Sequence, residues 1–171
     1  MFKKSAYQLF RFFVNLIMLL LPTYFLRRIF VKILGADISR NVNFERGVKF
    51  EFPWRLSINE GTTINSGVYL DCRGGSIIID KNVDISTDSF IYTLTHDIYS
   101  DTFNVKYANV HIHSKCWIGA RTVILPGSNI KTGSVIGANS VVRGQIEEYE
   151  LWLGVPACFI KKLPSHRSTN R

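Results

Sequence analysis

Cysteine is scarce in this chain: its 171 residues include only Cys72, Cys116 and Cys158. An odd number of cysteines, at spacings that match no zinc-binding pattern, argues against both a disulfide framework and a thiolate zinc module. We expect all three to be buried, reduced thiols. The length is that of one domain and leaves little room for a second.

Acidic side chains are absent from residues 1–36, which carry Lys3, Lys4, Arg11, Arg27, Arg28 and Lys32. The apolar run FFVNLIMLLLPTYFL lies between Arg11 and Arg27, and Asn15 and Pro22 interrupt it. It is shorter than the roughly 20 apolar residues that a membrane-spanning helix needs. No small-residue cleavage site follows, as a secretory signal would require. The segment 1–36 is therefore predicted to form two short helices, broken at Pro22.

A period of six residues runs through the second half of the chain. Aliphatic residues recur at that interval, and a small residue follows most of them after four positions. Neither the helical period of 3.6 nor strand alternation produces this spacing, which is typical of a hexapeptide solenoid. The aliphatic positions are Ile112, Ile118, Ile124, Ile130, Ile136 and Val142, and the small ones are Cys116, Thr122, Ser128, Ser134 and Ser140. We expect Gly119, Gly127, Gly133 and Gly137 to supply permissive backbone at the corners.

The same period can be followed upstream. It runs through Ile38, Phe44, Phe50 and Leu56, then Ile58, Ile64 and Leu70, then Ile79, Ile85 and Ile91. A single six-residue unit cannot bury its apolar face, so stacked units must form the core. The predicted fold is all-β, a left-handed parallel β-helix over residues 37–163, with an extruded loop at 92–109 and a polar tail at 164–171. The helices of 1–36 then either cap the open end of this solenoid or lie on an anionic membrane surface, or do both.

The loop at 92–109 interrupts an otherwise regular repeat, and loops on rigid scaffolds are where function concentrates. His96 stands near its start, between Thr95 and Asp97. An imidazole is suited to accepting a proton near neutral pH, so His96 is the candidate general base.

These features resemble the hexapeptide-repeat acyltransferases, and most closely the sugar O-acetyltransferases of the maltose, galactoside and colanic acid type. The resemblance rests on Thr95-His96-Asp97, on CWIGARTVILPGSNIKTGSVIGANSVV from Cys116 to Val142, and on Gly154-Val155-Pro156-Ala157 followed by Ile160-Lys161-Lys162. It covers residues 36–163 and implies that His96 is the catalytic base of an acetyl-CoA-dependent transferase. It also implies a homotrimer whose clefts are each shared by two chains.

The resemblance further assigns residues to the cofactor and to the acceptor. Directly after the Gly154–Ala157 turn the family usually has a lysine or arginine, and this chain has Cys158. Arg143 is expected to replace that positive charge. The cofactor residues implied are Trp117, Ala120, Ala138, Arg143, Lys161 and Lys162, and the acceptor residues are Asp71 and Asp97. For Asp71, a solvated corner residue is the alternative, and Asp97 is expected to support the loop. The backbone N–H of Ala120 would stabilise the oxyanion. No nucleophilic side chain is required, so the acetyl group would pass directly to the acceptor.

The expected function is O-acetylation of a sugar in a bacterial surface polysaccharide or its lipid-linked precursor, in the bacterial cytoplasm or on the inner face of its membrane. Alternatives are an N-acetyltransferase for a nucleotide-linked amino sugar, an antibiotic acetyltransferase and a non-catalytic scaffold. A carbonic anhydrase-like zinc site made by His96, His111 and His113 is a remote alternative, and no metal is expected. A nucleic-acid partner is not expected, because the basic residues are divided between the two ends of the chain.

Overall fold

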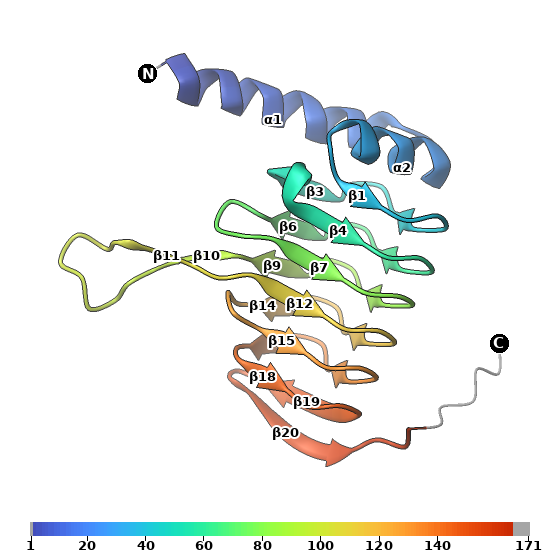
Figure 1. The fold of residues 1–171 in the computed structure, drawn as a ribbon, viewed down its shortest axis with the longest axis vertical. Helices are drawn as coiled ribbons and strands as arrows, with labels where there is room; N and C mark the ends of the chain where they lie inside the picture. Colours follow the sequence, from blue (N-terminus) through green and yellow to red (C-terminus); the bar gives the residue numbers. More distant parts are fainter. Residues whose placement is uncertain (1, 166–171) are drawn as a thin grey trace.

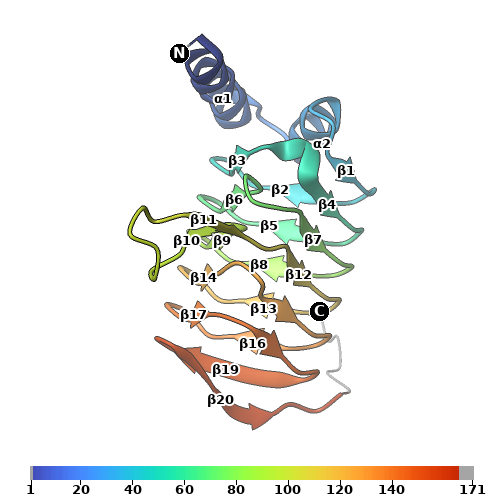
Figure 2. The same cartoon turned by 60° about the vertical axis from the view of Figure 1, so that its left-hand side comes forward.

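The computed structural model describes residues 2–165, so most of the predicted tail at 164–171 lies outside the described part. Two helices, α1 (Phe2–Leu20) and α2 (Tyr24–Ile33), precede a three-sided column of short parallel strands (Figures 1 and 2). The break between the helices falls at Pro22, as predicted. The column is the left-handed β-helix of the hexapeptide repeat, which confirms the predicted fold.

Each side of the column is one sheet. The first contains β1 (Asp37–Ile38), β4 (Leu56–Ile58), β7 (Ile77–Ile79), β12 (Val110–Ile112), β15 (Asn129–Ile130) and β18 (Gln145–Ile146). The second contains β2 (Asn43–Phe44), β5 (Thr63–Ile64), β8 (Asp84–Ile85), β13 (Trp117–Ile118), β16 (Val135–Ile136), β19 (Glu150–Gly154) and the antiparallel β20 (Ala157–Lys162). The third contains β3 (Lys49–Glu51), β6 (Tyr69–Asp71), β9 (Phe90–Tyr92), β14 (Val123–Ile124) and β17 (Val141–Val142). A 3₁₀ turn, η1 (Pro53–Arg55), precedes β4.

The repeat positions form the core. In the first sheet Ile58, Ile79, Ile112 and Ile130 stand in register on successive coils, and each is at most 2% exposed. The small positions are buried at the corners. There the hydroxyls of Thr122, Ser128 and Ser134 donate to backbone carbonyls, as Ser128 does to Leu125 O at 2.7 Å. Each coil therefore satisfies its backbone through the next one, which is why a period of six specifies a stack.

The corner glycines act in two ways. Gly127 and Gly133 have φ of +82° and +72°, the left-handed region that was expected. The expectation is wrong for Gly119 and Gly137, where space is the requirement. A Cβ on Gly119 would lie 2.5 Å from the backbone nitrogen of Ala138, on the neighbouring coil.

The thiols differ from the prediction at one position. Cys72 and Cys116 are buried, and burial raises the pKa of the Cys72 thiol to about 12. Cys158 is exposed, because it lies on β20, a strand added outside the last coil. The prediction of a buried thiol at this position is therefore wrong.

Both helices cap the first coil (Figure 1). Met18 and Val31 are fully buried in the core, and Asn15 accepts a hydrogen bond from the Phe50 N–H at the edge of the third sheet. Arg27 is 3% exposed and donates to the carbonyls of Phe44 and Leu21. The two helices therefore cover the open end of the solenoid, as one of the two predictions for this segment stated. Arg27 helps to attach them through its hydrogen bonds. No helix within residues 2–165 is long and apolar enough to cross a membrane.

Candidate active site

The predicted loop is a β-hairpin that projects from the side of the column (Figure 1). Its strands are β10 (Leu94–His96) and β11 (Val105–Tyr107), which pair antiparallel with His96 opposite Val105. At its base, Thr93 donates to the Asp71 carbonyl at 2.7 Å and accepts from the Gly74 N–H at 3.0 Å. The hairpin is therefore anchored to the coil before it and can hold a side chain away from the column.

His96 is exposed on this hairpin, and one hydrogen bond sets its protonation pattern. Its Nδ1 lies 2.7 Å from the carbonyl oxygen of Phe103. A carbonyl only accepts, so Nδ1 carries the proton and Nε2 of the neutral ring keeps its lone pair. Phe103 has φ of 50°, and this turn directs its carbonyl at the imidazole. The arrangement leaves Nε2 able to accept a proton.

Asp97 makes its bonds within the hairpin. One oxygen lies 3.0 Å from Lys106 Nζ and accepts from the Tyr99 N–H at 3.1 Å. The lysine and this N–H hold the pKa of the Asp97 carboxyl below its usual range. These contacts fit the expected support of the loop.

Asp71 is fully buried, so its reading as a solvated corner residue is wrong. Its carboxylate accepts from the guanidinium of Arg73, with Nη2 at 2.6 Å, and from the Arg73 backbone N–H at 3.0 Å. It stands in register with Tyr92, the last residue of β9 before the hairpin. Asp71 therefore lies beside the base of the hairpin, already paired with a cation.

Three aromatic residues on the outer face of the third sheet were not singled out from the sequence. We call them the aromatic patch: Tyr69, Phe90 and Tyr92. Their ring centroids lie within 6.3 Å of one another. Phe90 and Tyr92 are stacked with an interplanar angle of 4°. The available signal was their position beside the inward Leu70 and Ile91, because strand neighbours of a core residue face outward.

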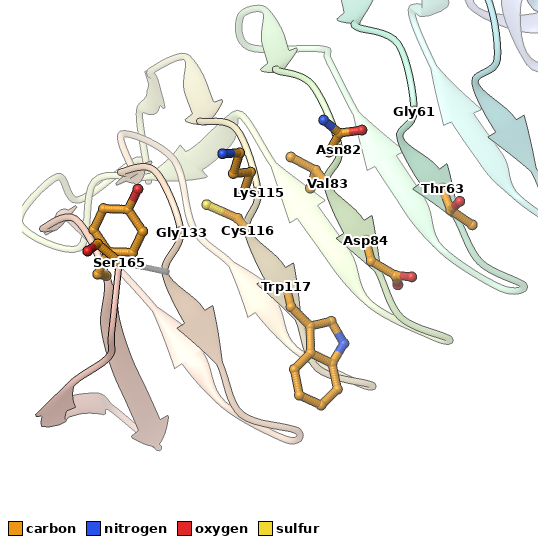
Figure 3. Close-up of a pocket in the computed structure, with 11 residues that line it drawn as sticks. Gly61, Thr63, Asn82, Val83, Asp84, Lys115, Cys116, Trp117, Gly133 and Ser165 are labelled. Carbon is orange, nitrogen blue, oxygen red and sulfur yellow. The ribbon is translucent and has the colours of Figure 1, made fainter. Parts of the chain in front are cut away.

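Trp117 lies on a different side of the column, in the second sheet. Its indole is 53% exposed, and its Nε1–H donates to Ser86 Oγ at 3.0 Å. It borders a cavity of about 650 Å³ whose lining residues come from five successive coils (Figure 3). Figure 3 shows Trp117, Asp84 and Thr63 on neighbouring strands, with Lys115 and Asn82 at the adjoining corner. His96 does not line this cavity.

The other predicted cofactor residues lie at two corners of the column and on strand β20. Ala120 and Ala138 occupy equivalent turns after β13 and β16, joined by a hydrogen bond from Asn139 N–H to the Ala120 carbonyl. Arg143 is exposed at the turn after β17, away from both. In β20 Lys161 is exposed, while Lys162 lies 3.0 Å from Glu150 and donates to the Glu148 carbonyl. Trp117, Ala120, Ala138 and Lys161 thus share one face or its edge, and Arg143 does not.

Within one chain, the three histidines of the remote zinc alternative do not come together. Among the described residues, the group that could hold a metal consists of His111, His113 and Asp80, without His96. The two histidines lie on the outer face of the first sheet, as strand alternation predicts, whereas His96 is on the hairpin. Burial, and then the neighbouring His111, lower the pKa of His113.

Residues 109–144 match the family of the bacterial transferase hexapeptide (six repeats). An Escherichia coli K12 protein named for colanic acid biosynthesis, the acetyltransferase WcaF, is 30% identical over 136 residues, which are 80% of this chain and 74% of the relative. The chain belongs to the bacterial transferase hexapeptide family.

Solved structures extend the likeness of this hexapeptide-family acetyltransferase to nearly its whole length. A Vibrio cholerae hexapeptide-repeat acetyltransferase, in complex with acetyl-coenzyme A, superposes with a TM-score of 0.85 at 24% identity and covers 94% of this chain and 89% of its own. A Clostridium difficile maltose O-acetyltransferase gives a TM-score of 0.83 at 22% identity, covering 94% and 88%. These two likenesses establish the shared fold.

Proposed function

We propose that this protein is an acetyl-CoA-dependent O-acetyltransferase whose acceptor is a sugar hydroxyl of a bacterial surface polysaccharide or of its lipid-linked precursor. The observation that carries the proposal is the hydrogen bond from His96 Nδ1 to the Phe103 carbonyl, which leaves Nε2 as the base. The family relationship supports acetyl transfer, and the WcaF relative and the maltose O-acetyltransferase neighbour favour a sugar acceptor.

The transfer needs one proton and one acyl group to move. Nε2 of His96 takes the hydroxyl proton as the sugar oxygen attacks the thioester carbonyl carbon, a step to which a placed base contributes about 10²–10⁴-fold. The carbonyl becomes an oxyanion, which we assign to the backbone N–H of Ala120. The C–S bond then breaks, and the imidazolium returns its proton to the leaving thiolate of coenzyme A.

The site is proposed to be shared by two chains. His96 projects beyond the third sheet, whereas Trp117, Ala120 and Ala138 lie on or at the edge of the second sheet of the same chain. A homotrimer with the columns side by side would bring the hairpin of one chain to the second sheet of the next, and cyclic symmetry would make three equivalent clefts. Acetyl-CoA would lie along Trp117 and the two alanine turns, with Lys161 toward its phosphates.

The acceptor is proposed to lie against the aromatic patch, near Asp71 and the hairpin base. Aromatic faces offer an apolar surface to the C–H face of a sugar ring. Arg73 balances the charge of the buried Asp71. The Arg73 side chain is 43% exposed, so its guanidinium is the group that an anionic or hydroxylated acceptor would meet. Asp71 is then a positioning residue for Arg73, a narrower role than direct sugar contact.

A membrane-bound acceptor is favoured by α1. On this helix Leu9, Phe12, Phe13 and Leu20 are each at least 50% exposed. Helices with such a face and neighbouring basic residues bind anionic membrane surfaces. Glu51 joins α1 to the aromatic patch, since it accepts from Tyr7 at 2.7 Å, Arg11 at 2.6 Å and Tyr69 at 3.0 Å. A lipid-linked glycan at the inner face of the membrane would thus meet the acceptor wall beside the helix.

Thiol release from acetyl-CoA, measured across a panel of acceptors, tests the proposal. A Cys158→Ser background removes the exposed thiol that would otherwise react with the detection reagent. The panel contains free sugars, lipid-linked glycans and amino sugars, and mass spectrometry identifies the acetylated atom. An acetyl ester on a sugar is expected. An amide product would replace O-transfer with the N-acetyltransferase alternative, and coenzyme A binding without transfer to any acceptor would favour the scaffold.

A further inference from the structure

A second cluster of polar side chains lies on the first sheet, on coils either side of the hairpin insertion. Asp80 follows β7, His111 is the middle residue of β12, and His113 follows that strand. Strands β7 and β12 pair in parallel with Ile79 opposite Ile112, so the three side chains flank two core residues from outside. They are partly exposed, at 27%, 34% and 23% for Asp80, His111 and His113. An ion can therefore reach them from solvent.

The distances within this cluster match the edges of a tetrahedral coordination shell. One Asp80 oxygen, Oδ2, lies 3.3 Å from His111 Nε2 and 3.4 Å from His113 Nδ1. A metal with bonds of about 2.0–2.1 Å to tetrahedral ligands separates those ligands by about 3.3 Å. All the potential ligand atoms lie within 4.8 Å of one another, and the imidazole rings are stacked with centroids 3.8 Å apart.

Hydrogen bonding explains why a cation fits here. His113 Nε2 lies 3.0 Å from Asn129 Oδ1, and the amide of Asn129 is oriented by donating to Gln145 at 3.0 Å. Nε2 of His113 is thus the protonated nitrogen, and its Nδ1 lone pair faces the Asp80 carboxylate. His111 Nε2 is buried and makes no hydrogen bond to any described residue. Lone pairs facing a carboxylate repel one another unless a positive charge lies between them.

We propose that Asp80, His111 and His113 bind one zinc ion, with water as the fourth ligand. Two imidazole nitrogens and one carboxylate oxygen suit zinc, whereas magnesium and calcium prefer oxygen ligands alone. Asn129 then holds one ligating histidine through its second nitrogen, a contact typical of metal-bound histidines.

The ion serves stability and has no part in the transfer step. It joins β7 to β12, between which the chain runs through β8, β9 and the whole hairpin. A link that closes a long segment of chain stabilises the folded state by restricting the unfolded one. The zinc ion would link the coil that precedes the His96 hairpin to the coil that follows it.

Zinc titration of tag-free, chelator-treated protein tests this inference, with calorimetry and native mass spectrometry as readouts. One zinc per chain is expected, and zinc at 100 times its Kd should raise the melting temperature by roughly 5–10 °C. Asp80→Asn and His113→Ala should each weaken zinc binding at least tenfold, and magnesium should produce no shift. His96→Ala is the matched control and should bind zinc as the unmodified chain does.

The variants need a folding check that is independent of the metal. Without zinc, Asp80→Asn should melt within a few degrees of the metal-free parent chain, so that a lost zinc effect reports the ligand and not misfolding. Cobalt substitution should give the visible absorption of a tetrahedral site. The inference is overturned if the parent chain binds no zinc, if Asp80→Asn and His113→Ala retain it, or if His96→Ala loses it.

Discussion

At the scale of the residue, one backbone carbonyl determines what His96 can do. Because Phe103 accepts the Nδ1 proton, the basic nitrogen is Nε2. Replacing His96 with Ala should lower kcat by about 10²–10⁴-fold while the Kd for coenzyme A stays within twofold, since the imidazole acts on the acceptor proton. Steady-state thiol release gives the first quantity and calorimetry the second. Near-normal turnover would contradict the assignment, and lost coenzyme A binding would place His96 at the cofactor.

Residues also show how far a pattern in the sequence can be interpreted. The period of six correctly predicted the inward isoleucines and the buried corner serines, because both follow from steric rules that repeat along the chain. It gave the wrong reason for Gly119, whose φ is ordinary and whose missing Cβ makes room for the Ala138 backbone. It also did not predict the burial of Asp71. Contacts between coils depend on pairs of residues about one coil apart, and single positions do not reveal them.

At the scale of the element, α1 is attached by a polar contact as well as by its apolar face. Glu51 is 1% exposed and accepts from Tyr7, Arg11 and Tyr69. Burial first, and then Glu51, raises the pKa of both tyrosines, so they remain protonated donors at neutral pH. Glu51→Gln puts an amide donor among these donors, and should lower the free energy of unfolding by about 1–3 kcal/mol.

Urea unfolding of matched variants measures this effect. Glu45→Gln is the control, because the Glu45 carboxylate accepts an exposed hydrogen bond from Tyr24, and surface changes of this kind stay within about 0.5 kcal/mol. Equal destabilisation by the two substitutions would mean that the Glu51 contact does not attach α1. The break between the two helices was predictable from Pro22, whereas this attachment was not, since nothing local marks Glu51 as a partner of Tyr7.

At the scale of the whole molecule, charge and exposed apolar surface meet at the capped end. On α1, Arg11 pairs with Glu51, and on α2, Arg27 is buried. The basic residues of α2 that can meet an anionic surface are therefore Arg28 and Lys32. Each basic residue near such a surface contributes about 1 kcal/mol, which salt screens. Arg28→Gln with Lys32→Gln should therefore reduce co-sedimentation with anionic vesicles at low salt. Lys81→Gln, on the solenoid, should leave it unchanged. If the protein stays in the supernatant under all conditions, the two helices only cover the end of the solenoid and do not bind membranes.

The shared cleft makes a prediction that no single chain can satisfy. If His96 comes from one chain and Trp117 from its neighbour, then His96→Ala and Trp117→Ala are each inactive alone but complementary in mixed trimers. After unfolding and refolding at equal amounts, about one quarter of the clefts would combine an intact His96 with an intact Trp117. Thiol release near one quarter of the parental rate is therefore expected, with light scattering to establish the trimer. Mixtures that stay inactive although mixed trimers form would place both residues in one chain's site, and a stable, active monomer would remove the need for a cleft between chains.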